Sequence, residues 1–206
     1  MQGHRAEATP LPQLLTERLY VELAMPAHAA LHAAFFARNR RHFARWDPPR
    51  GEVESAEYWT RALARSQADF EAGRSVALVA LPRGRAADVL VARINFTQIA
   101  RGAFHSCMLG FAADHEYEGR GLMFEALGSA IDWIFSALNL HRVQASHRPE
   151  NARSERLLAR LGFRPEGLAR EYLFIDGAWR DHVLNARLNP RFDASVFTQP
   201  AESAAG

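Results

Sequence analysis

One stretch of the sequence decides the fold: Tyr117-Glu118-Gly119-Arg120-Gly121-Leu122-Met123-Phe124-Glu125-Ala126-Leu127. Two glycines flank Arg120, after an apolar run typical of a strand and before a pattern typical of a helix. The N-terminus of a helix has unpaired N–H groups and a partial positive charge, and glycines let a ligand approach the backbone closely. The stretch therefore predicts a strand, a tight turn and a helix that together bind the phosphates of a small molecule carrying a pyrophosphate.

Other phosphate-binding glycine loops do not fit this stretch. It has neither the lysine nor the Ser/Thr of a Walker-type loop, and it lacks the G-x-G-x-x-G spacing and the βαβ context of dinucleotide binding. On these residues alone, the alternative interpretation is a plain tight turn that leads into a helix.

The composition is typical of a single globular domain. Of 206 residues, 48% are hydrophobic and 23% are charged, and no apolar run approaches the ~18 residues that a membrane span needs. Residues 1–12 have no apolar signal-peptide core, so we expect a cytoplasmic protein. The net charge of +2 is compatible with an anionic cofactor but is too small to predict direct nucleic-acid binding, for which no motif is present. The one cysteine, Cys107, lies in an apolar strand pattern and is expected in the core.

Hydrophobic periodicity and chain breakers predict the elements. The predicted strands are 15–25, 75–81, 89–97, 104–113, 141–146, 172–175 and 179–188, and the predicted helices are 27–45, 55–72, a long one from the glycine turn to about 139, and 151–161. The dipeptide Asp176-Gly177 between the last two strands is a strong hairpin signal.

The resulting order, β-α-α-β-β-β-α-β-α-β-β, predicts a mixed sheet with helices on both faces. The strands at 104–113 and 141–146 are joined through a helix, so they are expected to be parallel, whereas short connections favour antiparallel pairing elsewhere. We expect a flexible leader over 1–13, a single domain over 14–189 and a mobile tail over 190–206.

This order and the glycine turn resemble the GNAT superfamily of acetyl-CoA-dependent N-acetyltransferases. A second segment, Asn151-Ala152-Arg153-Ser154 leading to Leu161-Gly162-Phe163, is similar to the superfamily's Asn-x-x-Ser…Leu-Gly-Phe signature. The motifs from Leu109-Gly110-Phe111 to Trp179-Arg180-Asp181-His182 are, as a set, similar to the RimJ type, the ribosomal-protein-alanine N-acetyltransferases. The resemblance implies the GNAT fold, of class α/β (α+β), with a mixed, mostly antiparallel central sheet of about seven strands.

The resemblance also implies acetyl-CoA as co-substrate and a set of residues that bind it. Backbone N–H groups of Gly119 to Met123 would bind the pyrophosphate, with Arg120 adding positive charge. Phe111 and Ala112 would contact the pantetheine arm, which Asn151 would orient. The full implied set is Phe111, Ala112, Glu118, Gly119, Arg120, Gly121, Leu122, Met123, Asn151, Ser154 and Leu158.

Two positions depart from the superfamily pattern. Glu118 stands where Gln or Arg is usual, and Met123 stands where a small residue is usual. Because backbone N–H groups contact the phosphates, neither change removes a donor. Glu118 does place a negative charge near them, so its side chain has to point away or the affinity for the cofactor falls.

Acetyl transfer also needs a proton or hydrogen bond for the leaving thiolate. The resemblance implies Ser154 for this role. The alternative is plain helix capping, with Asn151 as the N-cap and Ser154 as an early-turn polar residue. Tyr172 is a second candidate acid, although a packed strand aromatic is the other interpretation.

The attacking amine must be neutral. An α-amino group has a pKa of about 8, against about 10.4 for lysine, so a modest base suffices for a protein N-terminus. Glu171 is the first candidate base, and a solvated charge at a strand edge is its alternative interpretation. Glu166, His147 and His182 are further candidates. No spacing of the nine histidines is typical of a metal site.

The implied acceptor is the N-terminal alanine of a ribosomal protein, attacked directly in a ternary complex. A small-molecule amine, such as an amino acid, polyamine or aminoglycoside, is the alternative acceptor. A third possibility is a non-catalytic, ribosome-associated protein that binds acetyl-CoA. We expect no membrane partner, and either a monomer or a homodimer.

Overall fold

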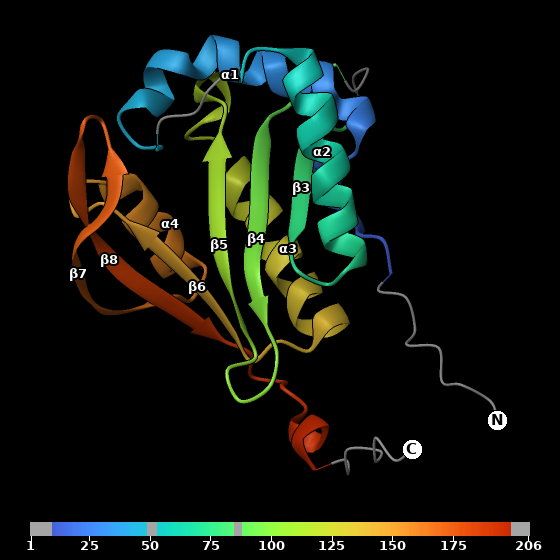
Figure 1. Ribbon diagram of the computed structural model, residues 1–206, viewed down its shortest axis with the longest axis vertical. Coiled ribbons are helices and arrows are strands. Elements are labelled where there is room, and N and C mark those ends of the chain that lie inside the picture. Colours follow the sequence, from blue (N-terminus) through green and yellow to red (C-terminus); the bar gives the residue numbers. More distant parts are fainter. Residues whose placement is uncertain (1–9, 49–52, 85–87, 199–206) are drawn as a thin grey trace.

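The computed structural model describes residues 10–48, 53–84 and 88–198, which form one sheet with helices on both faces (Figure 1). The strands are β1 (Gln13–Leu15), β2 (Leu19–Leu23), β3 (Val76–Pro82), β4 (Ala92–Ala100), β5 (Ser106–Ala113), β6 (Arg142–His147), β7 (Arg164–Ile175) and β8 (Ala178–Leu188). The helices are α1 (Ala29–Ala44), α2 (Ala56–Glu71), α3 (Leu122–Leu138) and α4 (Ala152–Arg160), with short 3-10 helices η1 (Pro26–His28), η2 (His115–Tyr117) and η3 (Ala194–Phe197). The predicted fold class is confirmed, and so is the order of the elements apart from one additional strand at the start.

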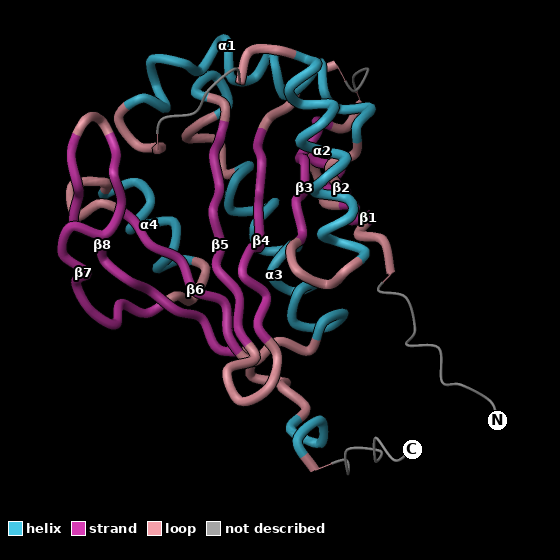
Figure 2. The backbone as a smooth tube through the Cα atoms, in the orientation of Figure 1, coloured by secondary structure: helices cyan, strands magenta, loops and turns pink. Residues whose placement is uncertain are grey.

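The sheet has eight strands in the order β1-β2-β3-β4-β5-β6-β8-β7 (Figure 2). The extra strand is β1, which pairs with β2 over only three residue pairs and is too short to show a period in the sequence. β7 is longer than the four-residue run predicted for it. Its first half is almost entirely exposed and is interrupted by register shifts, so it shows no apolar alternation.

The parallel pair β5 and β6 is confirmed, and it does not pair along its full length. The paired residues run from Ser106↔Arg142 to Leu109↔Ala145, after which β5 stays on β4 and β6 stays on β8. In Figure 1 the two strands meet at their lower ends and diverge upward. The sheet therefore opens at the carboxyl ends of these strands, next to the turn that follows β5.

Two apolar layers hold the helices on the sheet. On one face, an apolar stripe of α3 packs against the strands, and Leu127, Ile131 and Ile134 have no exposed surface. On the other face, α1 and α2 pack through Phe35 and Trp59 among others. Burial of each such side chain contributes about 1.5–3 kcal/mol to the stability of the fold. The start of α3 is therefore firmly packed against the sheet. Cys107 is buried in the core as predicted, and burial raises the pKa of its thiol to about 12.

The segment after β8 contacts the domain as far as it is described. The ring of Phe192 lies 5.5 Å from that of His105 and 5.1 Å from that of His141. Asn139 and Asp193 exchange two hydrogen bonds, of 2.9 and 3.0 Å. Residues 190–198 of the predicted tail thus pack against the sheet end, while 199–206, and residues 1–9 of the predicted leader, lie outside the described residues. Among the described helices, none is long and apolar enough to cross a membrane.

Candidate functional site

A cavity of about 670 Å³ lies where β5 and β6 part. It is bounded by the end of α1, the end of β5, the glycine turn, the start of α3 and one side of α4. Nine of the eleven predicted cofactor-binding residues line it: Phe111, Ala112, Glu118, Gly119, Gly121, Leu122, Met123, Asn151 and Ser154. The fold therefore gathers the glycine turn and the Asn151–Ser154 segment, which are 28 positions apart from Met123 to Asn151, around one space.

The glycine turn has the backbone that a phosphate site needs. Gly119 and Gly121 have φ of +73° and +77°, a conformation that side chains rarely adopt. Gly121 is the N-cap of α3 and supplies no side-chain hydrogen bond to the first N–H groups of that helix. These N–H groups border the cavity and have no capping side chain, so the turn fits the pyrophosphate of acetyl-CoA.

A second turn holds the glycine turn in place. Arg18, in the β1–β2 turn, donates to the carbonyl of Arg120 at 2.9 Å and to the Glu125 carboxylate at 2.7 Å. The same carboxylate accepts from the Thr16 hydroxyl at 2.5 Å and from the Arg18 N–H at 2.7 Å. Burial would raise the pKa of Glu125, but the hydrogen bonds from Thr16 and Arg18 outweigh it and hold this pKa below its usual value. Glu125 is thus ionised at neutral pH and ties the first turn of α3 to the first hairpin.

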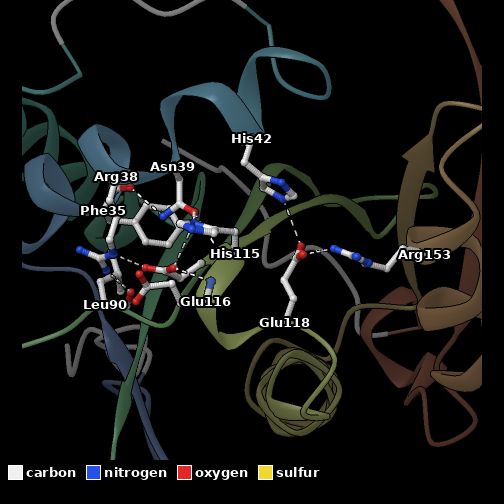
Figure 3. Close-up of polar contacts among 10 residues, drawn as sticks. Phe35, Arg38, Asn39, His42, Leu90, His115, Glu116, Glu118 and Arg153 are labelled. Atoms are coloured by element: carbon white, nitrogen blue, oxygen red, sulfur yellow. Dashed lines mark hydrogen bonds and ion pairs between the residues drawn. The ribbon is translucent and has the colours of Figure 1, made fainter.

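Helix α1 is fixed to the same region through η2. Asp114 has no exposed surface and accepts from Arg38. Arg38 also donates to the Leu90 carbonyl at 3.0 Å (Figure 3). Asn39 accepts from the His115 N–H at 2.9 Å. These contacts set the distance between α1 and the turn, and hence the width of the cavity between them.

Glu118 does not point away into solvent. Its carboxylate accepts from His42 Nε2 at 3.1 Å and forms an ion pair with Arg153 (Figure 3). Because a carboxylate only accepts, Nε2 carries the proton in this contact. Burial, followed by the charge of Arg153, lowers the pKa of His42, so its ring is neutral at pH 7. The negative charge predicted near the phosphates is therefore held by two cavity-lining residues.

Asn151 and Ser154 have different tasks. The side chain of Asn151 accepts from the Ser154 N–H at 3.1 Å, so the capping interpretation holds for Asn151. Both residues also line the cavity. Within the described part of the chain, the Ser154 hydroxyl has no hydrogen-bond partner, which leaves it available to a group in the cavity.

Two predicted cofactor residues lie elsewhere. Leu158 is 1% exposed and packs in the core, and its neighbour Leu157 lines the cavity in its place. One residue rotates a helix position by about 100°, enough to turn a lining side chain into a core side chain. The guanidinium of Arg120 lies over the Tyr117 ring, 5.5 Å from its centroid, rather than against the cavity.

The predicted catalytic residues of β7 are not brought to the cavity. Glu171 is exposed, and its N–H donates to Asp181 at 2.8 Å. The Tyr172 ring packs 5.5 Å from His182. Neither Glu171 nor Tyr172 lines the cavity, whereas Ser154 does.

The alternative bases are not in the cavity lining either. Glu166 forms an ion pair with Arg142. His147 and His182 are buried, and burial lowers the pKa of His182. Their Nδ1 atoms each contact a backbone carbonyl at 3.0 Å.

Several charged residues of the cavity were not predicted. The acids are Asp47 and Glu150, and the arginines of α4 are Arg153, Arg156 and Arg160. The arginine row was readable in the sequence, since positions i, i+3 and i+7 share one helix face. Asp47, Glu150 and His42 could not be assigned to the cavity from the sequence. Their position there depends on how α1 and the β6–α4 connection meet across the sheet.

The fold is that of the GNAT acetyltransferases. A family model described as an acetyltransferase (GNAT) domain matches residues 18–164, and the chain belongs to this family. It is an acetyl-CoA-dependent N-acetyltransferase by that membership.

The chain is also similar to individual proteins of this family. The chain is 38% identical over 191 residues to [ribosomal protein uS5]-alanine N-acetyltransferase of Escherichia coli (strain K12), covering 92% of this chain and 97% of that protein. The ribosomal-protein-S5-alanine acetyltransferase of Vibrio fischeri is 33% identical, with a TM-score of 0.84 over 88% of this chain and 99% of the other. RimJ of Mycobacterium smegmatis, solved in complex with CoA-disulfide, is 28% identical, with a TM-score of 0.79 over 86% of each chain.

Proposed function

We propose that the protein transfers the acetyl group of acetyl-CoA to the N-terminal alanine of a ribosomal protein, by direct attack in a ternary complex, in the cytoplasm. The observation that carries the proposal is the joint presence of the uncapped glycine turn and of Asn151 and Ser154 around one cavity. The choice of acceptor is supported by the identity to the uS5-alanine N-acetyltransferase, which extends over nearly the full length of both chains. Residues 14–189 would form the single catalytic domain.

The residues of the cavity suit each requirement of the reaction. Acetyl-CoA supplies an activated acetyl thioester. The N–H groups of residues 119–123 would hold its phosphates, and the Ser154 hydroxyl would donate to the leaving thiolate. A thioester held next to Phe111 and Ala112 would be partly shielded from competing hydrolysis by water.

The acceptor amine would enter beside the acids of the cavity. Asp47 and Glu150 line it, and Glu150 is ionised at neutral pH, since hydrogen bonds from its own N–H and from Arg148 lower its pKa. Carboxylates attract an incoming ammonium group. An α-amine needs little help to lose its proton near neutral pH, because its pKa is about 8. Glu171 stays a predicted base, which the Glu171→Gln variant tests, and neutral His42 is a second candidate because it lines the cavity.

The test is an acetylation assay with peptides that differ only at the first residue. Purified protein is mixed with acetyl-CoA and peptides starting with Ala, Ser or Met, and with a panel of small amines, and thiol release is followed. Cys107 is buried with a raised pKa, so it does not contribute to the thiol signal. An N-acetylated copy of the Ala peptide, with its internal lysines intact, is the matched control.

We expect turnover on the Ala peptide, none on its N-acetylated copy, and a single acetyl group on the α-amine by mass spectrometry. Turnover only on small amines contradicts the ribosomal acceptor but keeps the chemistry. Binding of acetyl-CoA without turnover on peptides, amines or ribosomal subunits contradicts the enzyme function. Whether the protein is a monomer or a homodimer stays a prediction that light scattering checks.

A further inference from the structure

Glu118 occupies an unusual place for a carboxylate. It directly precedes Gly119 in the turn whose N–H groups suit a pyrophosphate, and its side chain is only 18% exposed. It lines the cavity together with both of its partners, His42 and Arg153. The chain thus keeps an anion of its own at the place where it would bind the anions of a cofactor.

The partner of this carboxylate is the residue that a phosphate would attract. Arg153 comes from α4, across the cavity from the turn, and its side chain is 63% exposed, so its guanidinium is open to an incoming ligand (Figure 3). Arginine binds phosphates with two parallel hydrogen bonds, and a pyrophosphate carries two negative charges against one on a carboxylate. A partly exposed Arg–Glu pair is worth only about 0–1 kcal/mol, so a phosphate can replace it.

We propose that Glu118 competes with the phosphates of acetyl-CoA for Arg153 and so sets the affinity of the protein for its cofactor. Without cofactor, the ion pair neutralises Arg153 and joins the turn to α4 across the cavity. When phosphates bind, Arg153 turns to them and Glu118 keeps the hydrogen bond from His42. The ion pair re-forms as CoA leaves, which lowers the cost of product release.

The test measures binding of CoA and acetyl-CoA by calorimetry, without acceptor. Glu118→Gln removes the charge but keeps the shape and can still accept from His42. We expect Kd to fall by about three- to tenfold, since one ion pair no longer has to be broken and one repulsion is lost. Arg153→Gln should raise Kd by a similar factor. The matched control is Glu116→Gln, the same charge change two residues away on an exposed side chain outside the cavity lining, with Kd unchanged.

Two further readouts separate competition from a structural effect. The gain in affinity of Glu118→Gln should shrink as salt is raised from 50 to 500 mM, because screening weakens both the pair and the repulsion. The Kd for S-acetyl-pantetheine, which carries no phosphate, should be the same in Glu118→Gln and the parent protein. Thermal unfolding of each variant confirms that it is folded.

Weaker or unchanged CoA binding by Glu118→Gln overturns the proposal, as does an equal change with S-acetyl-pantetheine. The inference rests on the acetyl-CoA site but not on the acceptor. A protein that binds CoA as described and fails to acetylate the Ala peptide would contradict the proposed function alone.

Discussion

A single glycine controls whether the phosphate-binding turn can form. Gly121 has φ of +77°, and a Cβ there would meet the guanidinium of Arg18 at 3.5 Å. Gly121→Ala should destabilise the fold by about 1–2 kcal/mol, because alanine is strained at this φ. It should also raise the Kd for acetyl-CoA, because the distorted turn changes the direction of the N–H groups at the start of α3. Urea unfolding and calorimetry measure the two effects.

Gly128, about two turns further along α3, is the matched control. It has ordinary helical backbone, and a Cβ there would meet no atom within 4 Å. Gly128→Ala should therefore stabilise the protein by about 0.5–1 kcal/mol and leave Kd unchanged. Equal effects of the two substitutions would contradict the role of the turn conformation.

A substitution of Ser154 tests whether its hydroxyl donates to the leaving thiolate. Ser154→Ala should lower kcat by about 10²-fold and leave KM for acetyl-CoA within about twofold, because the hydroxyl would act on the leaving group rather than on binding. Steady-state kinetics with the Ala peptide measure both constants. Ser129→Ala on α3, whose hydroxyl donates to the Ala126 carbonyl at 3.0 Å, removes a hydroxyl outside the cavity and should change neither. A rise in KM without a fall in kcat would assign Ser154 to cofactor binding instead.

At the scale of elements, the first hairpin and α3 act as one unit through Arg18 and Glu125. Their ion pair has an N–O distance of 2.7 Å, and the Glu125 side chain is only 15% exposed. A double-mutant cycle of Arg18→Gln and Glu125→Gln should give a coupling of about 1 kcal/mol in unfolding free energy, and each single variant should weaken acetyl-CoA binding. The control pair, Arg74 and Asp69, is exposed by 64% and 42%, so its coupling should be near zero and its loss should not affect binding. Additive effects of the Arg18 and Glu125 variants would contradict the conclusion that this ion pair couples the first hairpin to α3.

The sequence predicts elements better than it predicts how they meet. Helices with a clear apolar stripe, such as α3, and the glycine turn were found because their signals are local. β1 was missed because three residues carry no period. The contact of Asn39 with His115 joins residues 76 positions apart, so only the folded chain brings them together.

The candidate site, like the fold, could be predicted from the sequence only where its signals are local. Nine of the residues predicted to bind the cofactor, in three short segments, line one cavity, since the strand–turn–helix order fixes where each segment lies. Glu171 and Tyr172 do not line the cavity, and their catalytic roles stay predictions. His42 and Asp47 were missed because nothing local marks the end of α1 as part of a binding site.

For the whole molecule, the buried histidine of α1 links stability to pH. His32 is 2% exposed and lies 4.6 Å from the Trp59 ring, ring centroid to centroid. Burial, with smaller effects of the charges of Arg93 and His28, lowers its pKa from 6.5 to about 4. Its Nδ1 lies 3.1 Å from the His28 carbonyl, so Nδ1 carries the proton of the neutral ring.

The direction in which stability changes with pH depends on which state, folded or unfolded, binds a proton on His32. Between pH 6.5 and 4 the unfolded chain protonates His32 and the folded chain does not, so the free energy of unfolding falls as the pH falls. From pH 6.5 to 5 this one group accounts for about 2 kcal/mol. The lowered pKa values of His42 and His182 act in the same direction, so the effect of His32 must be read as a difference between variants.

His32→Gln removes the titrating group, and urea unfolding at pH 7.5, 6.5 and 5 measures the slope. We expect the variant to be less stable than the parent at pH 7.5, where the parent keeps its packed ring, and to lose less stability on acidification, so that the two curves converge towards pH 5. His141→Gln, which removes an exposed histidine, should keep the parent's slope. Parallel curves for His32→Gln and the parent would show that the ring is protonated in the folded protein, and that α1 and α2 can admit a charge between them.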